Sequence, residues 1–221
     1  KNVKLFKTGL RGKSDSLAYF MADSVLHFYQ DPVLWNEESQ ITADSIDVTI
    51  SDGWIDQMFT RRNSFIINED STKNFNQVKG RDMVAHFADN QLYLVDVNGN
   101  GESIYFALEE NSNEVMGMNR IICSDMKIRL LENKVNNITS YTNPDGKFVP
   151  THELVESEKK LSGFRWRIEE RPELWQILHI SQEEYYELYE QPRLFMQQED
   201  GPEASDRNRA VPARPCRSTS R

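Results

Sequence analysis

The sequence predicts an all-β fold in which short antiparallel strands stack as hairpin-like units. Runs of alternating apolar and polar residues recur along the chain, at intervals of 21, 19, 18, 21 and 22 residues. The runs begin at Val25, Ile46, Phe65, Met83, Ile104 and Met126. Such an interval holds two short strands and two turns, whereas a βαβ crossover needs about 30 residues or more. Gly and Asn, which tolerate positive φ, separate runs at 51–53, 89–90 and 98–101.

Side chains within the clearest runs alternate with a period of two. Ile46, Val48 and Ile50 share one face of their strand, and Asp47 and Thr49 share the other. Weaker return strands lie at 32–35, 54–59, 92–97 and 135–138. No amphipathic helix is predicted within the repeat to cover the apolar face. Two sets of strands must therefore face each other, as in a sandwich, a jelly roll or an open fold.

The alternation lapses after a turn cluster at 142–146, and the bulky residues of 161–172 have no clear period. We place the end of the β domain at Pro172, so that it spans residues 1–172, with a start that we expect to be truncated. Ser181 and Glu184 have the spacing of a capping box, which predicts a short helix at 181–190 within an extension of residues 173–197. Residues 198–221, which end rich in Pro, Arg and Ser, are predicted to be disordered.

The charge is unevenly distributed along the chain. Residues 201–221 hold five Arg, one Glu and one Asp, a net of +3, so the first 200 residues carry -9 - 3 = -12. Phosphate-backbone binding relies on clustered Lys and Arg, so an acidic body argues against a nucleic-acid partner. No stretch approaches the roughly 20 apolar residues of a membrane-spanning helix.

The histidines and cysteines do not form a metal-binding pattern. Cys123 and Cys216 show no CxxC spacing, and the four histidines have no companion at i,i+4. We expect packing or surface roles for the histidines, and neither a metal site, a disulfide scaffold nor a cofactor.

Aspartates stand one or two residues before several runs, at Asp23, Asp44, Asp82 and Asp125. A glycoside hydrolase needs two carboxylates in different environments. Recurrence at successive units is instead typical of a residue at a turn or at the entry of a strand. We therefore predict a structural role for these four and no catalysis.

Three segments together resemble a known family. They are ADSVLHFYQDPVLWNEESQITADSIDVTI at 22–50, FNQVKGRDMVAHFADNQLYLVDVNGNGESIYF at 75–106 and LSGFRWRIEERP at 161–172. They resemble the OstA-like proteins of Gram-negative lipopolysaccharide transport, the group of LptA, LptC and the N-terminal domain of LptD. The resemblance covers residues 14–172 and implies an open, V-shaped antiparallel β-jelly roll with an apolar groove for acyl chains. Residues 173–221 match nothing in that family.

The groove that the resemblance implies is lined by apolar residues of the recurring runs. They are Val25, Ile46, Val48, Ile50, Phe65, Ile67, Met83, Ala85, Phe87, Ile104, Phe106, Met126, Ile128 and Leu130. In the first run, His27 and Tyr29 depart from an aliphatic face.

The expected function is non-enzymatic binding and transfer of lipopolysaccharide or a related lipid, within a periplasmic bridge to the outer membrane. Related β-jelly-roll proteins, or further copies of the chain, would pair with it through edge strands. Two alternatives stay open. A carbohydrate- or lipid-active β-enzyme would show two converging carboxylates about 5–10 Å apart, and a structural assembly module would have a closed core.

Overall fold

The computed structural model describes residues 2–189, except residues 8, 90, 110, 111, 113, 132 and 133. The chain divides into two compact units, residues 1–179 and residues 180–221. In the second unit, helix α2 (Gln182–Tyr189) follows Ser181, whose Oγ accepts a hydrogen bond from the N–H of Glu184 at 3.0 Å. The helix predicted at 181–190 is therefore present. The tail predicted at 198–221 lies outside the described residues.

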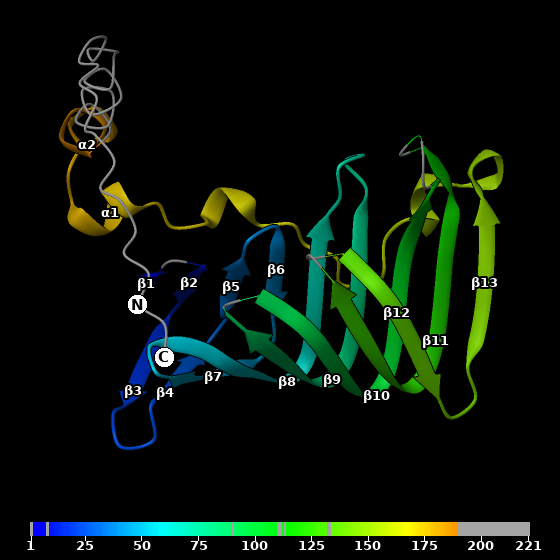
Figure 1. Cartoon of the computed structure of the whole chain (residues 1–221), viewed down its shortest axis with the longest axis horizontal. Coiled ribbons are helices and arrows are strands. Elements are labelled where there is room, and N and C mark those ends of the chain that lie inside the picture. The colour runs from blue at the N-terminus through cyan, green and yellow to red at the C-terminus, as the bar shows by residue number, and fades with distance from the viewer. Residues whose placement is uncertain are drawn as a thin grey trace, which may run out of the picture. The chain divides into compact units, whose positions relative to one another are not determined.

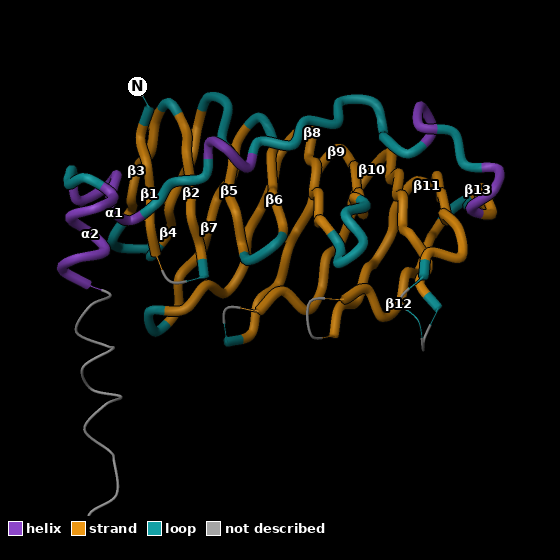
Figure 2. The backbone as a smooth tube through the Cα atoms, turned by 90° about the horizontal axis from the view of Figure 1, so that it is seen from above, coloured by secondary structure: helices purple, strands orange, loops and turns teal. Residues whose placement is uncertain are grey.

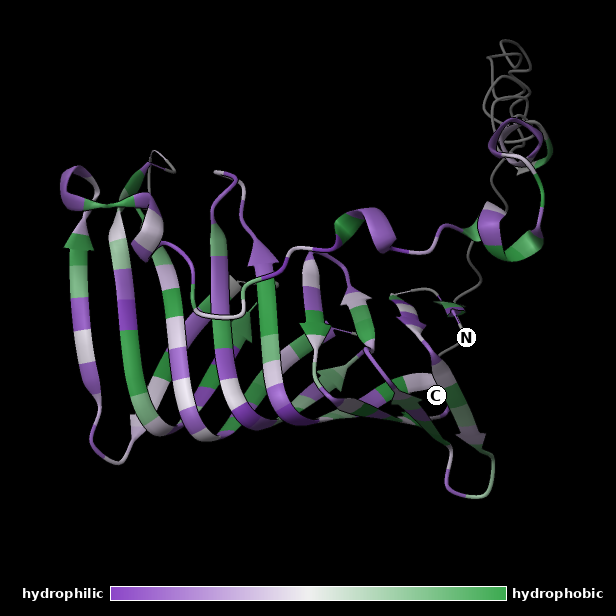
Figure 3. Cartoon of the chain, turned by 180° about the vertical axis from the view of Figure 1, so that it is seen from behind, coloured by the Kyte–Doolittle hydropathy of each residue, from purple (hydrophilic) through white to green (hydrophobic). Residues whose placement is uncertain are grey.

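A single antiparallel sheet makes up most of the first unit (Figure 1). Its strands are β1 (Val3–Lys7), β2 (Leu10–Ser14), β3 (Ser16–Phe20), β4 (Val25–Tyr29), β5 (Val33–Asn36), β6 (Ser39–Thr42), β7 (Ser45–Ser51), β8 (Trp54–Glu69), β9 (Phe75–Ala88), β10 (Gln91–Leu108), β11 (Val115–Leu131), β12 (Lys134–Tyr141) and β13 (Asp145–Pro150). Polar and apolar bands alternate along the long strands, as their period of two requires (Figure 3).

The sheet folds along a corner into two walls, because β8, β9, β10 and β11 each pass from one wall to the other. Wall A contains β1, β2, β5, β6 and β13, together with residues 64–69, 75–80, 101–108 and 115–123 of the long strands. Wall B contains β3, β4, β7 and β12, together with residues 54–61, 82–88, 91–98 and 125–131. Among the described strands, no pairing joins the two walls at their free edges, which confirms the predicted open, V-shaped β-jelly roll.

Pairs of residues with positive φ turn the chain from wall B into wall A. They are Gln30 with Asp31, Arg62 with Asn63, Gly99 with Asn100, and Thr142 with Asn143, all with φ between 52° and 79°. Two of these pairs coincide with register shifts in the ladders of β8 and β10. Bulges of this kind bend a strand and let it change sheets.

Aspartates stabilise the same corner where the chain passes back from wall A to wall B. Asp82 accepts a hydrogen bond from the N–H of Arg62 at 3.0 Å, and Asp125 accepts one from the N–H of Gly99 at 2.9 Å. Asp44 accepts one from the side-chain amide of Asn63 at 2.9 Å. Asp23 lies in the β3–β4 turn, where its N–H donates to a backbone carbonyl. The carboxylates of Asp44, Asp82 and Asp125 therefore have the structural role that their recurrence predicts.

After β13 the chain runs back across wall A as a strap, residues 151–178, from the β13 end to the β1 end (Figure 2). The strap contains three 3-10 turns, η1 (Thr151–Glu153), η2 (Glu156–Glu158) and η3 (Ile168–Glu170), and the short helix α1 (Leu174–Leu178). Its Leu161, Phe164 and Trp166 pack with Phe65 and Phe106 into an apolar cluster on the outer face of wall A. This outer cluster is separate from the main core between the walls.

Candidate functional site

The space between the walls is close-packed toward the N-terminal strands. Leu10, Phe28 and Leu34 are each at most 1% exposed and belong to the main core. A methyl group added at Gly12 would come within 2.6 Å of Leu34 and 3.2 Å of Phe28. The chain's own side chains therefore fill this part of the interior.

Toward β12 the walls enclose a cavity of about 400 Å³. Ile66 and Val78 border it from the inner face of wall A. The outer cluster lies on the opposite face of the same wall. Apolar residues from wall B complete the lining: Leu92, Val95, Ile128, Leu130, Val135 and Ile138. The volume lies within the roughly 300–1,000 Å³ that is usual for small-molecule sites, so this cavity is the candidate functional site.

The cavity becomes polar along wall A with distance from the corner. Ile66, Val78 and Ser103 are neighbours across the ladder. Two residues further from the corner, Asn68 pairs with Asn76, and Tyr105 follows on the neighbouring strand. All three line the cavity. A ligand here would meet apolar side chains at depth and amide or phenol groups near the rim.

Three carboxylates border the rim, those of Glu38, Glu69 and Asp70. Burial, with a smaller effect from the charge of Asp70, raises the pKa of Tyr105, so its phenol stays protonated at neutral pH. The rim therefore combines negative charge with a hydrogen-bond donor.

The structure divides the predicted groove residues into three sets. Nine lie in or against the main core between the walls: Ile46, Val48, Ile50, Met83, Ala85, Phe87, Met126, Ile128 and Leu130. Four belong to the outer cluster beneath the strap: Phe65, Ile67, Ile104 and Phe106. Ile104 and Phe106 also border the cavity, but they pack with the outer cluster. Val25 belongs to neither set.

The expectation that Phe65 and Ile67 face the inner space was wrong, because the recurring runs do not all lie in one wall. The runs at 46, 83 and 126 lie in wall B, whereas those at 65 and 104 lie in wall A. At the corner the register shifts between β8 and β9, so in β9 the inward positions change from even numbers at Val78 to odd numbers at Met83, whereas β8 keeps one parity.

Val25 is displaced for a related reason. In β4 the inward side chains are Leu26 and Phe28, which stand opposite Val48 and Ile46. Val25 therefore shares the outer face with His27 and Tyr29. The departure of His27 and Tyr29 from an aliphatic face indicated this register.

Two buried glutamines hold the strap by pairing with its backbone. Gln40 donates from Nε2 to the carbonyl of Arg165 at 2.7 Å and accepts from the N–H of Arg167 at 2.6 Å. Gln77 donates to the carbonyl of Lys159 at 2.7 Å and accepts from the N–H of Leu161 at 2.8 Å. Each amide thus pairs with residues i and i+2, as a neighbouring strand would. The sequence analysis missed both residues.

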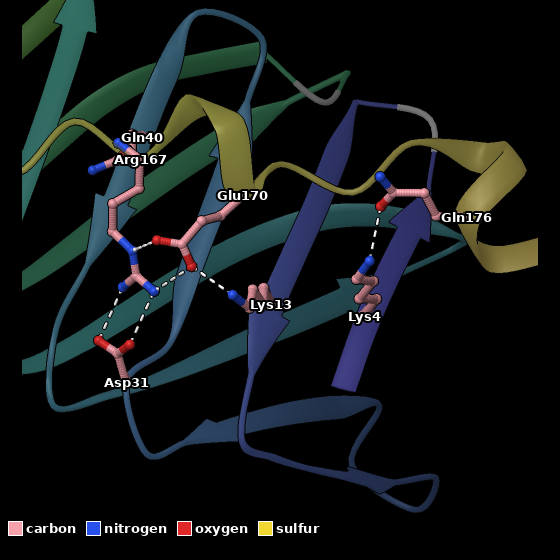
Figure 4. Close-up of polar contacts among 7 residues, drawn as sticks. All are labelled: Lys4, Lys13, Asp31, Gln40, Arg167, Glu170 and Gln176. Atoms are coloured by element: carbon pink, nitrogen blue, oxygen red, sulfur yellow. Dashed lines mark hydrogen bonds and ion pairs between the residues drawn. The ribbon is translucent and has the colours of Figure 1, made fainter. Parts of the chain in front are cut away.

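Ion pairs fix the strap at its β1 end (Figure 4). The guanidinium of Arg167 binds both oxygens of Asp31 at 2.9 Å and both oxygens of Glu170, at 2.7 and 2.8 Å. Lys13 binds Glu170 at 2.5 Å, and Lys4 donates to Gln176 at 2.8 Å. Arg167 and then Lys13 lower the pKa of Glu170 to about 2, because both favour its charged form.

The outer face of wall B carries two His–Asp pairs. Nδ1 of His27 lies 2.6 Å from Asp47, which also binds Arg61, and Nε2 of His86 lies 3.0 Å from Asp96, which also binds Lys127. Such pairs across neighbouring strands are typical of a solvated face. Within residues 2–189, apart from the seven omitted positions, no group of three or more His, Cys, Asp or Glu is placed to hold a metal ion.

No protein-family model matches the chain, and no curated protein matches its sequence. Among solved structures, the chain is similar to LptH of Pseudomonas aeruginosa, described as the LptA-homologous periplasmic component of the lipopolysaccharide transport device. The sequences are 12% identical, the TM-score is 0.49, and the match covers 64% of this chain and 95% of that one. The function of this chain is therefore inferred from its own side chains.

Proposed function

We propose that the chain binds the acyl part of a lipid, lipopolysaccharide or a related amphiphile, and passes it on without a covalent step. It would do so in the periplasm, as one component of a bridge to the outer membrane. The observation that carries the proposal is the cavity of about 400 Å³ between the two walls, with its apolar lining. A closed-core assembly module would have filled this space with side chains.

Hydrophobic transfer supplies the free energy of binding. Each CH₂ group that leaves water contributes about 0.8 kcal/mol, so a few methylenes against Val78, Ile128 and Leu130 already favour the bound state. The body of the chain is acidic, with a net charge of -12 over the first 200 residues, obtained as -9 - 3. The tails rather than an anionic head group would therefore drive binding.

Free strand edges support transfer between proteins. Among the described residues, β12 and β13 each pair only with β11, and β1 and β3 each have a single neighbour at the other end. Such edges present unpaired N–H and C=O groups that another strand can join. A related jelly roll, or a further copy of this chain, would extend the two walls and continue the space between them.

The proposal is tested by titrating the protein with a fluorescent acyl probe. Val78→Trp places an indole in the cavity and should abolish saturable binding without unfolding the chain. Ile122→Trp is the matched control, because Ile122 is 44% exposed on the outer face of wall A, and it should bind as the wild type does. Wild-type protein that shows no saturable binding, or equal binding by both variants, would refute the proposal.

A further inference from the structure

Two buried polar atoms in the cavity wall lack hydrogen-bond partners. Ser103 is 1% exposed, and its Oγ has no partner among the described residues. Its position opposite Val78 and Ile121 in the ladders directs it to the inner face of wall A, where it lines the cavity. Asp70 lies at the rim, and its Oδ2 is buried and likewise unpartnered.

Leaving these atoms unpaired is costly, because a buried polar atom without a partner loses the hydrogen bonds that water would give it. The other carboxylate oxygen of Asp70 is fully used, because Oδ1 accepts from the N–H of Thr72, its hydroxyl and the N–H of Asn74. The turn therefore fixes Asp70 with Oδ2 free, at the rim of an apolar cavity. The hydroxyl of Ser103, deep in the cavity, can donate a hydrogen bond, and Oδ2 of Asp70, at the rim, can accept one. One ligand could therefore contact both groups.

We infer that the cavity takes an acyl chain joined through an ester or amide to an uncharged head group that carries hydrogen-bond donors. The inference rests on the proposed function and narrows the lipid class. The chain runs between Val78 and Ile128, the linking carbonyl accepts from Ser103, and a hydroxyl or N–H of the head group donates to Asp70. Asn68 and Tyr105 flank the head group between these two points.

The charge at the rim sets the selectivity. Glu38, Glu69 and Asp70 all border the cavity, and Lys73 lies 3.4 Å from Glu69. The repulsion from Glu38 and Asp70 is strong where water is partly excluded. A carboxylate or phosphate at the same depth meets this repulsion. An uncharged head group avoids it and satisfies the free oxygen of Asp70.

The experiment compares 1-monooleoylglycerol with oleate, which share one acyl chain, by displacement of the fluorescent acyl probe at neutral pH. Wild-type protein should bind 1-monooleoylglycerol about tenfold or more tightly than oleate. Asp70→Asn keeps the Oδ1 acceptor of the turn, so it should fold normally and lose most of this preference. Asp52→Asn, in the exposed β7–β8 turn, is the matched control and should keep it.

Ser103→Ala tests the second contact. It should weaken the binding of 1-monooleoylglycerol about fivefold, as expected for the loss of one hydrogen bond, and leave the binding of octadecane, which has no hydrogen-bonding group, unchanged. Equal affinity for the two lipids in the wild type, or an unchanged preference in Asp70→Asn, would overturn the inference while the proposed function stands. If the probe itself does not bind, the proposed function fails first.

Discussion

Gln77→Ala should loosen the strap from wall A and destabilise the fold by about 3–5 kcal/mol. The substitution removes two hydrogen bonds to the strap backbone, which contribute about 1 kcal/mol each, and leaves the N–H of Leu161 buried without a partner at a further cost of about 1–3 kcal/mol. Leu161 is 2% exposed, so water does not replace the lost acceptor.

Denaturant unfolding measures the loss of stability, and hydrogen exchange at Leu161 shows where it occurs. Gln91→Ala truncates an amide at an exposed strand position and should change stability by less than about 0.5 kcal/mol. The role assigned to Gln77 would be refuted if its variant matched Gln91→Ala in stability and kept wild-type exchange at Leu161.

Three further predictions concern the core, the ion pairs and the edges. Ile128→Asp should cost several kcal/mol in a thermal melt, because it buries an unpaired carboxylate, whereas the exposed Arg129→Ala should cost under about 1 kcal/mol; equal costs would contradict the face assignment. Glu170 stabilises the fold above its ordinary pKa of 4.5, and this contribution is lost as pH falls toward its folded pKa of about 2. The stability difference between wild type and Glu170→Gln should therefore shrink over that window, and a constant difference in acid titrations would argue against the ion pairs. Thr139→Pro and Ser140→Pro remove N–H groups from opposite sides of β12. Light scattering should therefore show weaker self-association in one variant, while the other loses fold stability. A wild-type protein that is monomeric at all concentrations would exclude edge pairing.

The strands and the role of the recurring aspartates were predictable because each depends on local chemistry. The period of two at Ile46–Ile50 and the Gly and Asn turns identify an antiparallel β fold directly. Recurrence of Asp44, Asp82 and Asp125 indicated a structural role, which the corner hydrogen bonds explain. The division of the runs between the two walls was not predictable from the period, because β8 to β11 each continue through the corner as one strand.

Much of the cavity lining and the strap contacts were missed for two different reasons. Val78 is inward because the corner changes the parity within β9, where Met83 is also inward, and a single strand pattern cannot show this. Ile66 keeps the parity of Met58, but a run taken to begin at Phe65 places Phe65 and Ile67 inward instead. Gln40 and Gln77 are isolated amides within strands, and their partners lie 125 to 127 and 82 to 84 residues away in the sequence. The bulky residues of 161–172 lacked a period because part of this segment packs against the sheet as a strap, outside any regular strand or long helix.

The most direct test is photo-crosslinking of bound lipid from defined positions on the two faces. A photoreactive residue at Ile138, which lines the cavity from β12, should crosslink to acyl chains when the protein is produced in a Gram-negative periplasm. The same residue at Ile122, on the outer face of wall A, should not. Acyl adducts at Ile138 alone are the predicted result. Adducts at Ile122 alone, or equal yields at both positions, would contradict lipid binding between the walls.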